Sequence, residues 1–437
     1  MKTTTLLLLL FLTLTVQAEP ATGGASDALL PRLSLDEVTR VVLNRSPALR
    51  EALKQWEAAK QRVTQEGAWD DLKVSGTSKV RRYIDIPPNA FTDQMLSVEQ
   101  AIPIFGKNRV RARIAAAEAV SAFEAVRRQQ LDVIAKARAS YFRLANAYAQ
   151  IELNRKNYES LTQIAEINRS RYEVGTQTVG NVLVSETEAS KLLEARRDLE
   201  RSVAAEQSQL NVLMNRDAFA PLGSPDEVRI TSAPFSINKL RALTLANRPE
   251  VGMASARIDA EKAKLRLAHR AWIPDPSLKV EGQRYNAAAQ SVSELDAGIS
   301  FTVPWGNVRK YSAGVSEATA NVDAAQAALN RTQEEAIGFL RDALQKVETA
   351  QHHVELFRDK LVPQARQAFE ANQLSYESGK ASFIEWITAQ RNLRDLEAEA
   401  RLHLAEYQSA LAELEAVVGA DLKIFPLTET KPNKNRE

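Results

Sequence analysis

Residues 107–174 contain neither glycine nor proline, and this 68-residue stretch constrains the fold more than any other feature of the sequence. At ~1.5 Å per residue, an uninterrupted helix of this length would be about 100 Å long. Its apolar positions are spaced three or four residues apart, as in a coiled-coil seam: Leu131, Ile134, Ala137, Tyr141, Leu144, Tyr148 and Ile151. Such a helix exceeds any ordinary globular core, so we expect other helices to be laid along it.

The chain also repeats itself at an offset of 200 to 204 residues. Three motifs recur in the same order: Leu33-Ser-Leu with Asn44-Arg-Ser-Pro47 and Phe235-Ser-Ile with Asn247-Arg-Pro249; Pro103-Ile-Phe-Gly106 and Pro304-Trp-Gly306; Arg171-Tyr172-Glu-Val-Gly175 and Ser375-Tyr376-Glu-Ser-Gly379. The repetition predicts two copies of one unit, over 33–217 and 235–419, with a linker at 218–234 and a tail at 420–437.

Each unit has the same predicted order. A short helix is ended by Pro47 or Pro249, and an α-β-β-α-α succession follows, with a glycine turn between the last two helices. The long helix of each unit is expected to pack against two shorter ones placed end to end: 107–174 against 47–67 and 181–215, and 307–375 against 250–271 and 381–418. Gly338 and Pro363 are expected irregularities in the second long helix.

The first residues are typical of an export signal. Lys2 precedes an eleven-residue apolar run, Leu6 to Val16, and Val16-Gln17-Ala18 fits a small-residue cleavage site. We therefore expect a signal peptide at 1–18 and an N-terminal linker at 19–32. Because nothing later approaches eighteen consecutive apolar residues, no transmembrane helix is expected. Two possibilities remain: a soluble exported protein, or one that enters a membrane as β-strands.

Composition excludes several functions. With 57 Lys+Arg against 55 Asp+Glu, the formal charge is +2, which excludes a strongly basic nucleic-acid binder. The absence of cysteine removes disulfides, thiolate metal sites, cysteine nucleophiles and a lipid-modified cysteine. No cofactor motif is present, and the adjacent His352 and His353 are interpreted as exposed helix residues. The sequence therefore predicts neither an enzyme nor a resident metal site.

Four segments alternate apolar and polar residues with a period of two, at about 70–84, 94–104, 277–286 and 294–303. Strands of a transmembrane barrel alternate in this way, but so do strands of an ordinary half-buried antiparallel sheet. Aromatic residues favour the barrel. Four stand at the helix-side roots of the strands and three near their far ends: Trp69, Phe105, Trp272 and Trp305, then Tyr83, Phe91 and Tyr285. The 14 residues from Trp69 to Tyr83 correspond to roughly 35 Å along the membrane normal.

Four strands cannot close a barrel, and lipid does not tolerate their unpaired edges. Two protomers would supply eight strands around a packed interior, whereas three would supply twelve around a lumen. Seven charged residues are expected to point inward: Lys73, Lys79, Arg81, Glu99, Lys279, Glu281 and Asp296. A wet lumen accommodates these charges better than a packed interior, so a homotrimer is predicted.

These features together resemble the TolC family of outer-membrane efflux channels over nearly the whole chain after the signal peptide. The most specific segments are RYEVGTQTVGNVLVSETEAS from Arg171, SYESGKASFIEWITAQRNL from Ser375 and QAIPIFGKNRVRARIAAAEA from Gln100. Pro-x-x-Gly-Lys followed by Arg in the last segment is most similar to the CzcC-like branch, which exports heavy-metal cations.

The resemblance implies a mostly α fold with a membrane β-barrel portion. A trimer would form a 12-stranded barrel in the bacterial outer membrane and a long α-barrel across the periplasm. It would act as the passive exit duct of a tripartite system, with a periplasmic adaptor and an inner-membrane pump of the RND type. The expected cargo is heavy-metal cations, and the alternative is drugs or other small molecules. The alternative hypotheses from other functional classes are a periplasmic coiled-coil adaptor and an exported helical enzyme.

The resemblance also implies a gate at the periplasmic tip. The family closes the tip with inward-facing acids six and nine residues after the second turn glycine, which correspond here to Glu385 and Thr388; Thr388 departs from the acidic pattern. Asn181 is the equivalent of Glu385 in the first repeat. Tyr376 matches a tyrosine that takes part in closure, and Tyr172 matches it by repeat. Gly175 and Gly379 are expected to be turn glycines with positive φ.

Overall fold

The computed structural model describes residues 32–78, 94–226, 236–286 and 291–420. The predicted signal peptide, the far-end aromatics Tyr83 and Phe91, and the tail from residue 421 lie outside the described residues. Lys79 and Arg81, expected to point inward, also lie outside them.

In the first repeat, the described residues form four helices and two strands of the main sheet: α1 (Leu35–Arg45), α2 (Pro47–Gly67), β2 (Lys73–Ser78), β3 (Gln94–Ala101), α3 (Lys107–Glu173) and α4 (Val179–Leu213). The second repeat has the same order: α5 (Ile237–Asn247), α6 (Pro249–Arg270), β5 (Pro276–Asn286), β6 (Ser291–Phe301), the 3-10 turn η1 (Pro304–Asn307), α7 (Val308–Leu356), the π-helical turn η2 (Phe357–Leu361), α8 (Val362–Glu377) and α9 (Phe383–Val418). The predicted fold class, a mostly α duplicated unit with two strands per copy, is confirmed.

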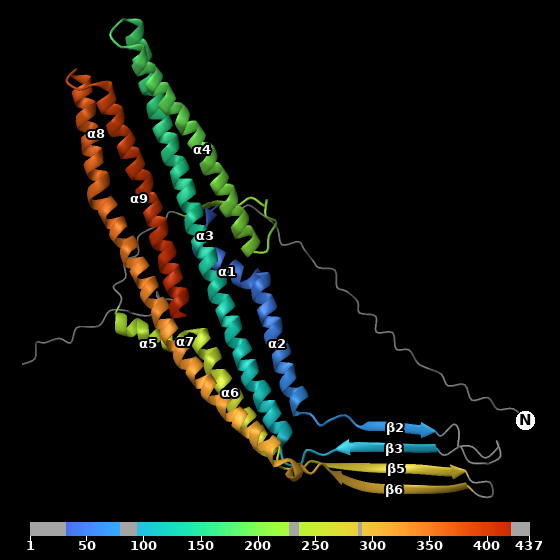
Figure 1. Ribbon diagram of the computed structural model, residues 1–437. Helices are drawn as coiled ribbons and strands as arrows, with labels where there is room; N and C mark the ends of the chain where they lie inside the picture. Colours follow the sequence, from blue (N-terminus) through green and yellow to red (C-terminus); the bar gives the residue numbers. More distant parts are fainter. Residues whose placement is uncertain (1–31, 79–93, 227–235, 287–290, 421–437) are drawn as a thin grey trace, which may run out of the picture.

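The helix α3 runs without interruption from the sheet to the far end of the molecule (Figure 1). The helices α2 and α4 pack along its two ends, and α6 and α9 contact it from the second repeat. The second repeat distributes the same length over α7, η2 and α8. In both repeats, one long helical rod is flanked by two shorter helices placed end to end, as the sequence predicts.

One of the two expected irregularities in the second rod is observed. The π-helical turn Phe357–Leu361 ends two residues before Pro363, whose ring nitrogen cannot donate a helical hydrogen bond, so the helical hydrogen-bond pattern shifts at this point. The expectation of an irregularity at Gly338 was wrong, because α7 continues through it. A single glycine costs a helix only about 1 kcal/mol relative to alanine, which the packed rod tolerates.

The main sheet has the order β2-β3-β5-β6, and every neighbouring pair is antiparallel. The register places Lys73, Glu99 and Lys279 side by side on one face, with Ser97, Glu281 and Asp296 in the next row. The opposite face carries Val74, Leu96, Val280, Leu295 and Ile299, all exposed, up to 77% for Leu295. The sheet is therefore amphipathic, with an uncovered apolar face.

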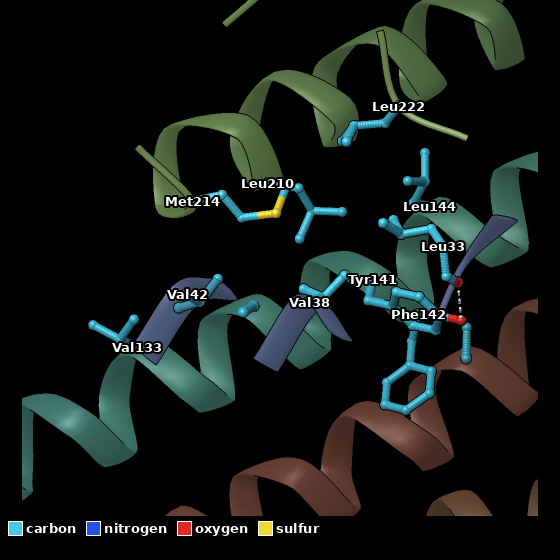
Figure 2. Close-up of a cluster of buried hydrophobic side chains, with 12 residues drawn as sticks. Leu33, Val38, Val42, Val133, Tyr141, Phe142, Leu144, Leu210, Met214 and Leu222 are labelled. Atoms are coloured by element: carbon cyan, nitrogen blue, oxygen red, sulfur yellow. Dashed lines mark hydrogen bonds between the residues drawn. The ribbon is translucent and has the colours of Figure 1, made fainter. Parts of the chain in front are cut away.

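Two equivalent hydrophobic cores lie in the middle of the molecule, one in each repeat. In the first, β1 (Arg32–Leu33) and α1 pack between α3 and α4, with Val38 and Val42 buried against Val133 and Leu210 (Figure 2). In the second, α5 buries Leu240 against α7 and α9. The opening helix of each repeat, α1 or α5, thus packs where the two helices that flank the long rod meet end to end.

The linker joins this region through an unpredicted two-residue pairing, with β1 parallel to β4 (Ser224–Pro225). The Tyr141 hydroxyl donates to the Leu33 carbonyl at 2.9 Å and accepts from the Asp226 N–H at 3.1 Å. Burial raises the pKa of Tyr141 to about 12, with the Asp226 charge adding to the effect. Among the described helices, none is both long and apolar enough to cross a bilayer.

Candidate gate at the helical tip

The two hairpin turns lie at the end of the molecule opposite the sheet (Figure 1). Gly175 has φ 76° and Gly379 has φ 73°, the left-handed conformation in which glycine avoids the steric cost of a Cβ. The Gly175 N–H donates to the Tyr172 carbonyl at 2.9 Å, and the Gly379 N–H to that of Tyr376 at 3.0 Å. These bonds satisfy carbonyls that each helix end leaves without an intrahelical partner.

Tyr376 connects the second hairpin to the first. Its hydroxyl accepts from Gln177 Nε2 at 2.7 Å and from Arg171 Nη1 at 3.3 Å, and it donates to Asn168 Oδ1 at 3.3 Å. Asn168 is buried and donates in turn to Ser185 Oγ at 2.8 Å. One side chain of α8 thus bonds to both α3 and the turn before α4.

An aromatic cluster supports this hydroxyl. The Tyr376 ring stacks on Trp386 with centroids 5.0 Å apart and an interplanar angle of 16°, and Phe383 meets both rings at an angle. Phe383, Trp386 and Ile387 of α9 are buried with Leu161 and Leu192 of the first hairpin. The two hairpins therefore share one small apolar core just behind the tip.

Glu385 and Thr388 lie on an exposed face at the start of α9. The Glu385 carboxylate accepts from the Ser382 N–H at 2.8 Å while Ser382 Oγ accepts from the Glu385 N–H at 3.2 Å, which forms a capping box. The Thr388 hydroxyl donates to the Ile384 carbonyl at 2.7 Å. Both residues are exposed, and Glu385 also caps α9, a local structural role that was not predicted from the sequence.

The first-repeat candidates occupy different positions. Asn181 is half-buried and donates to Gln177 Oε1 at 2.7 Å, so Gln177 links it to Tyr376. Tyr172 is 48% exposed and has no side-chain hydrogen bond among the described residues. The repeat symmetry that pairs Tyr172 with Tyr376 in sequence therefore does not hold for their environments.

The aromatic residues predicted at the strand roots lie at the junction between sheet and helices. Trp69, Phe105 and Trp305 are exposed, and Trp272 is half-buried with its ring 5.6 Å from that of Tyr311. Tyr285 lies near the far end of β5, where its backbone is paired with Val292.

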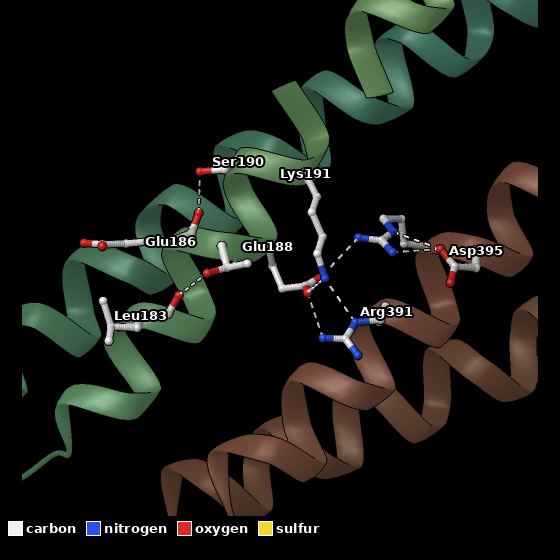
Figure 3. Close-up of polar contacts among 9 residues, drawn as sticks. Leu183, Glu186, Glu188, Ser190, Lys191, Arg391 and Asp395 are labelled. Atoms are coloured by element: carbon white, nitrogen blue, oxygen red, sulfur yellow. Dashed lines mark hydrogen bonds and ion pairs between the residues drawn. The ribbon is translucent and has the colours of Figure 1, made fainter. Parts of the chain in front are cut away.

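A buried charge lies between the hairpins and was not predicted from the sequence. The Glu188 side chain of α4 is only 4% exposed, and three cations surround it (Figure 3). Lys191 Nζ lies 2.8 Å from Oε1, Arg391 Nη2 lies 2.9 Å from Oε1, and Arg394 Nη1 lies 3.7 Å from Oε2. Because Arg391 and Arg394 belong to α9, this Glu188 cluster is a second connection between the hairpins.

Burial by itself would raise the pKa of Glu188. The hydrogen bonds and charges of Lys191 and Arg391 outweigh burial, and the net effect lowers its pKa. A sequence signal for the pair existed: Glu188 is 13 residues after Gly175, and Arg391 is 12 after Gly379. Because the two hairpins lie side by side with their turns at the same end, residues at a similar number of positions after each turn come close together.

The described contacts between the two hairpins at the tip are non-covalent. Within residues 32–78, 94–226, 236–286 and 291–420, no group of three or more His, Cys, Asp or Glu side chains could hold a metal ion. What the tip offers is a set of hydrogen bonds, stacked rings and ion pairs that hold two hairpins together.

The chain matches the family model described as "Outer membrane efflux protein" over residues 38–216 and 240–420, once per repeat. A toluene efflux pump outer membrane protein, TtgF from Pseudomonas putida, is 26% identical over 226 residues, which are 51% of this chain and 46% of that protein. The chain thus aligns with about half the length of this relative. The pyoverdine export outer membrane protein OpmQ of Pseudomonas putida is 24% identical over 407 residues, 87% of this chain and 80% of the relative.

The fold is similar to that of the outer membrane protein VceC from Vibrio cholerae. The TM-score is 0.70 at 19% identity, covering 88% of this chain and 96% of the other. The family match spans both repeats and includes the strands, the rods and the tip. The chain therefore belongs to the outer membrane efflux protein family, the family of outer-membrane channels that its sequence resembles.

Proposed function

We propose that this protein is the exit duct of a tripartite efflux system, a passive channel that works with a periplasmic adaptor and an inner-membrane pump of the RND type. The observation that carries the proposal is the sheet, whose apolar face is exposed and whose edge strands β2 and β6 have no further partner among the described residues. Lipid requires every backbone group to be paired, so the sheet needs neighbours of the same kind. Three copies would give twelve strands and a polar lumen, with the helical rods extending into the periplasm.

The architecture also weighs against the periplasmic-adaptor alternative. An adaptor is expected to carry one helical hairpin between β-rich domains, whereas the described part of this chain has two hairpins and one four-stranded sheet at the opposite end. The polar face of the sheet, with Lys73, Glu99 and Lys279 in one row, suits the wall of a wet lumen better than contact with a partner's apolar core.

The tip is the proposed gate. Three copies of Glu385 converging on one axis would repel one another and would attract cations. Thr388, Asn181 and Tyr376 would complete the closed surface, and Tyr172 would stand at its rim. Gly175 and Gly379 would set the turns that shape it.

We propose heavy-metal cations as the cargo, on the strength of the Pro103-Ile-Phe-Gly106-Lys107 passage and its similarity to the CzcC-like branch. Relatives named for export of toluene and pyoverdine keep drugs or other small molecules as the alternative. Deleting the gene and measuring sensitivity to zinc, cobalt and cadmium salts, and separately to organic solvents and dyes, distinguishes the two cargo classes.

Two measurements test the channel itself. The protein should be found in the outer-membrane fraction as a trimer that dissociates on heating in detergent, and it should conduct ions in planar bilayers. A stable, detergent-free monomer in a periplasmic extract would contradict the proposal.

The capping box makes the test of Glu385 sharper. Glu385→Gln removes the charge but retains an oxygen that can cap α9, whereas Ser382→Ala removes a cap and retains the charge. If charge repulsion at the axis sets conductance, Glu385→Gln changes it and Ser382→Ala does not. Equal effects of the two variants would mean that the residue acts only on its helix end.

A further inference from the structure

Two of the four histidines, distant in sequence, meet in the middle of the second hairpin. The His353 ring of α7 and the His403 ring of α9 have centroids 4.8 Å apart. His353 lies 26 residues before Gly379 and His403 lies 24 after it, so the antiparallel hairpin brings them to the same level. His352 is exposed, as predicted, but His353 is half-buried because α9 returns alongside it, so the prediction for His353 was wrong.

A carboxylate fixes the orientation of one of these rings. His403 Nδ1 lies 2.8 Å from Glu406 Oε2, and the centroid of the His403 ring lies 4.7 Å from that of Phe357. When Nδ1 donates its hydrogen to the carboxylate, Nε2 keeps its lone pair. Carboxylates hold metal-binding histidines in this way and raise the basicity of the ligating nitrogen.

The pair is reachable from solvent and lies at an irregular point of the rod. His353 and Glu406 line a groove of about 820 Å³ between α3, α7 and α9, and the His403 side chain is 20% exposed. The π-helical turn Phe357–Leu361 begins four residues after His353. Pro363 accounts for the turn, but π-helical turns also occur frequently at functional sites.

We propose that His353 and His403 bind one divalent first-row transition-metal ion, with two imidazole nitrogens as protein ligands and water completing the shell. A metal 2.0–2.1 Å from each nitrogen lies roughly 3.2 Å from each ring centroid, so rings at 90–110° around it have centroids about 4.5–5.2 Å apart. The observed 4.8 Å falls within this range. The bound ion would join α7 to α9.

Two protein ligands set the expected strength and selectivity of the site. Structural zinc sites use four ligands, so this one binds more weakly than they do. Nitrogen ligands follow the order Co²⁺ < Ni²⁺ < Cu²⁺ > Zn²⁺, and oxygen-seeking Mg²⁺ and Ca²⁺ should not compete. An ion bound here would be resident on the rod, apart from any cargo of the proposed channel.

Titration calorimetry on the tag-free, full-length protein in detergent tests the site with Cu²⁺, Ni²⁺ and Co²⁺ in turn. We expect one ion per chain, with His353→Gln and His403→Gln each abolishing binding. Glu406→Gln should weaken it roughly 10- to 100-fold, the usual effect of losing an orienting carboxylate. The matched controls are the other two histidines, and His269→Gln and His352→Gln should bind as the wild type does.

Two further measurements test whether the variants fold and how many nitrogens bind the ion. Melting curves without metal establish that each variant folds, and electron paramagnetic resonance of the Cu²⁺-loaded wild type counts ligating nitrogens directly. Two equivalent imidazole nitrogens support the proposal. Binding that survives in His353→Gln and His403→Gln, or a spectrum without two nitrogens in the wild type, would overturn it.

Discussion

Tyr376 and Tyr172 occupy equivalent positions in the two repeats, yet only Tyr376 bonds across to the other hairpin. Tyr376→Phe keeps the stacking on Trp386 but removes the hydroxyl that contacts Gln177, Arg171 and Asn168. A hydrogen bond in a partly buried place contributes about 0.5–1.5 kcal/mol. We expect single-channel openings to become more frequent and longer, and Tyr172→Phe to leave them unchanged. Equal behaviour of the two variants would show that Tyr376 does not hold the hairpins together.

The Glu188 cluster predicts a defined acid sensitivity. Because the folded-state pKa of Glu188 is lowered from 4.5, its ionised form contributes stability above about pH 4.5, and this contribution is lost as the pH falls through the folded pKa. The wild type should therefore exceed Glu188→Gln in unfolding temperature at pH 7, and the difference should shrink on acidification below pH 4.5. A difference that is constant from pH 7 to pH 3 would contradict this account.

The same cluster predicts an asymmetry between its partners. Arg391 and Lys191 are partly exposed and can turn to solvent when Glu188 is replaced by Gln. Removing the two arginines instead leaves the buried carboxylate with Lys191 as its one remaining partner, and a buried charge that loses most of its compensation is strongly destabilising. The double variant Arg391→Ala/Arg394→Ala should therefore unfold at lower denaturant concentration than Glu188→Gln. The reverse order would show that the carboxylate is more solvated than its burial indicates.

The helices α8 and α9 are both followed by a glycine, but the surroundings of the two glycines differ. Gly379 and Gly419 both have left-handed backbones, but a Cβ at Gly379 would have open space around it, whereas one at Gly419 would lie 2.8 Å from the Asn247 carbonyl oxygen of α5. Left-handed φ costs a non-glycine residue roughly 1–2 kcal/mol. Gly379→Ala should lose about that much stability in denaturant unfolding, and Gly419→Ala clearly more. Similar losses would mean that α5 can move away from the end of α9.

The sequence predicts elements better than it predicts contacts between them. The absence of Gly and Pro from 107 to 173 anticipates α3, and period-two alternation anticipates the strands, because both patterns express local geometry. The capping role of Glu385 was also visible in principle, since Ser382 stands three residues before it. Glu188 with Arg391, and His353 with His403, depend on which faces of which helices meet. Such contacts can be predicted from the sequence only once the register of the two helices in each hairpin is known.

At the scale of the whole molecule, the two faces of the sheet should respond differently to added charge. Leu96 lies on the exposed apolar face between Gly76 and Gly282, and Thr77 lies on the polar face. A lysine facing lipid near the midplane costs about 2–4 kcal/mol, whereas one in a wet lumen costs little. Leu96→Lys should therefore lower the fraction of heat-sensitive trimer in the outer membrane, and Thr77→Lys should not. Opposite results would mean that the apolar face does not contact lipid.

The unbroken α3 and its divided counterpart also give the two halves unequal mechanics. A rod of 67 residues, about 100 Å long, resists flexing everywhere along its axis, while the second rod has its helical ladder reset at Phe357–Leu361. We therefore expect bending of the second rod to concentrate at Phe357–Leu361, whereas α3 should bend as one continuous helix.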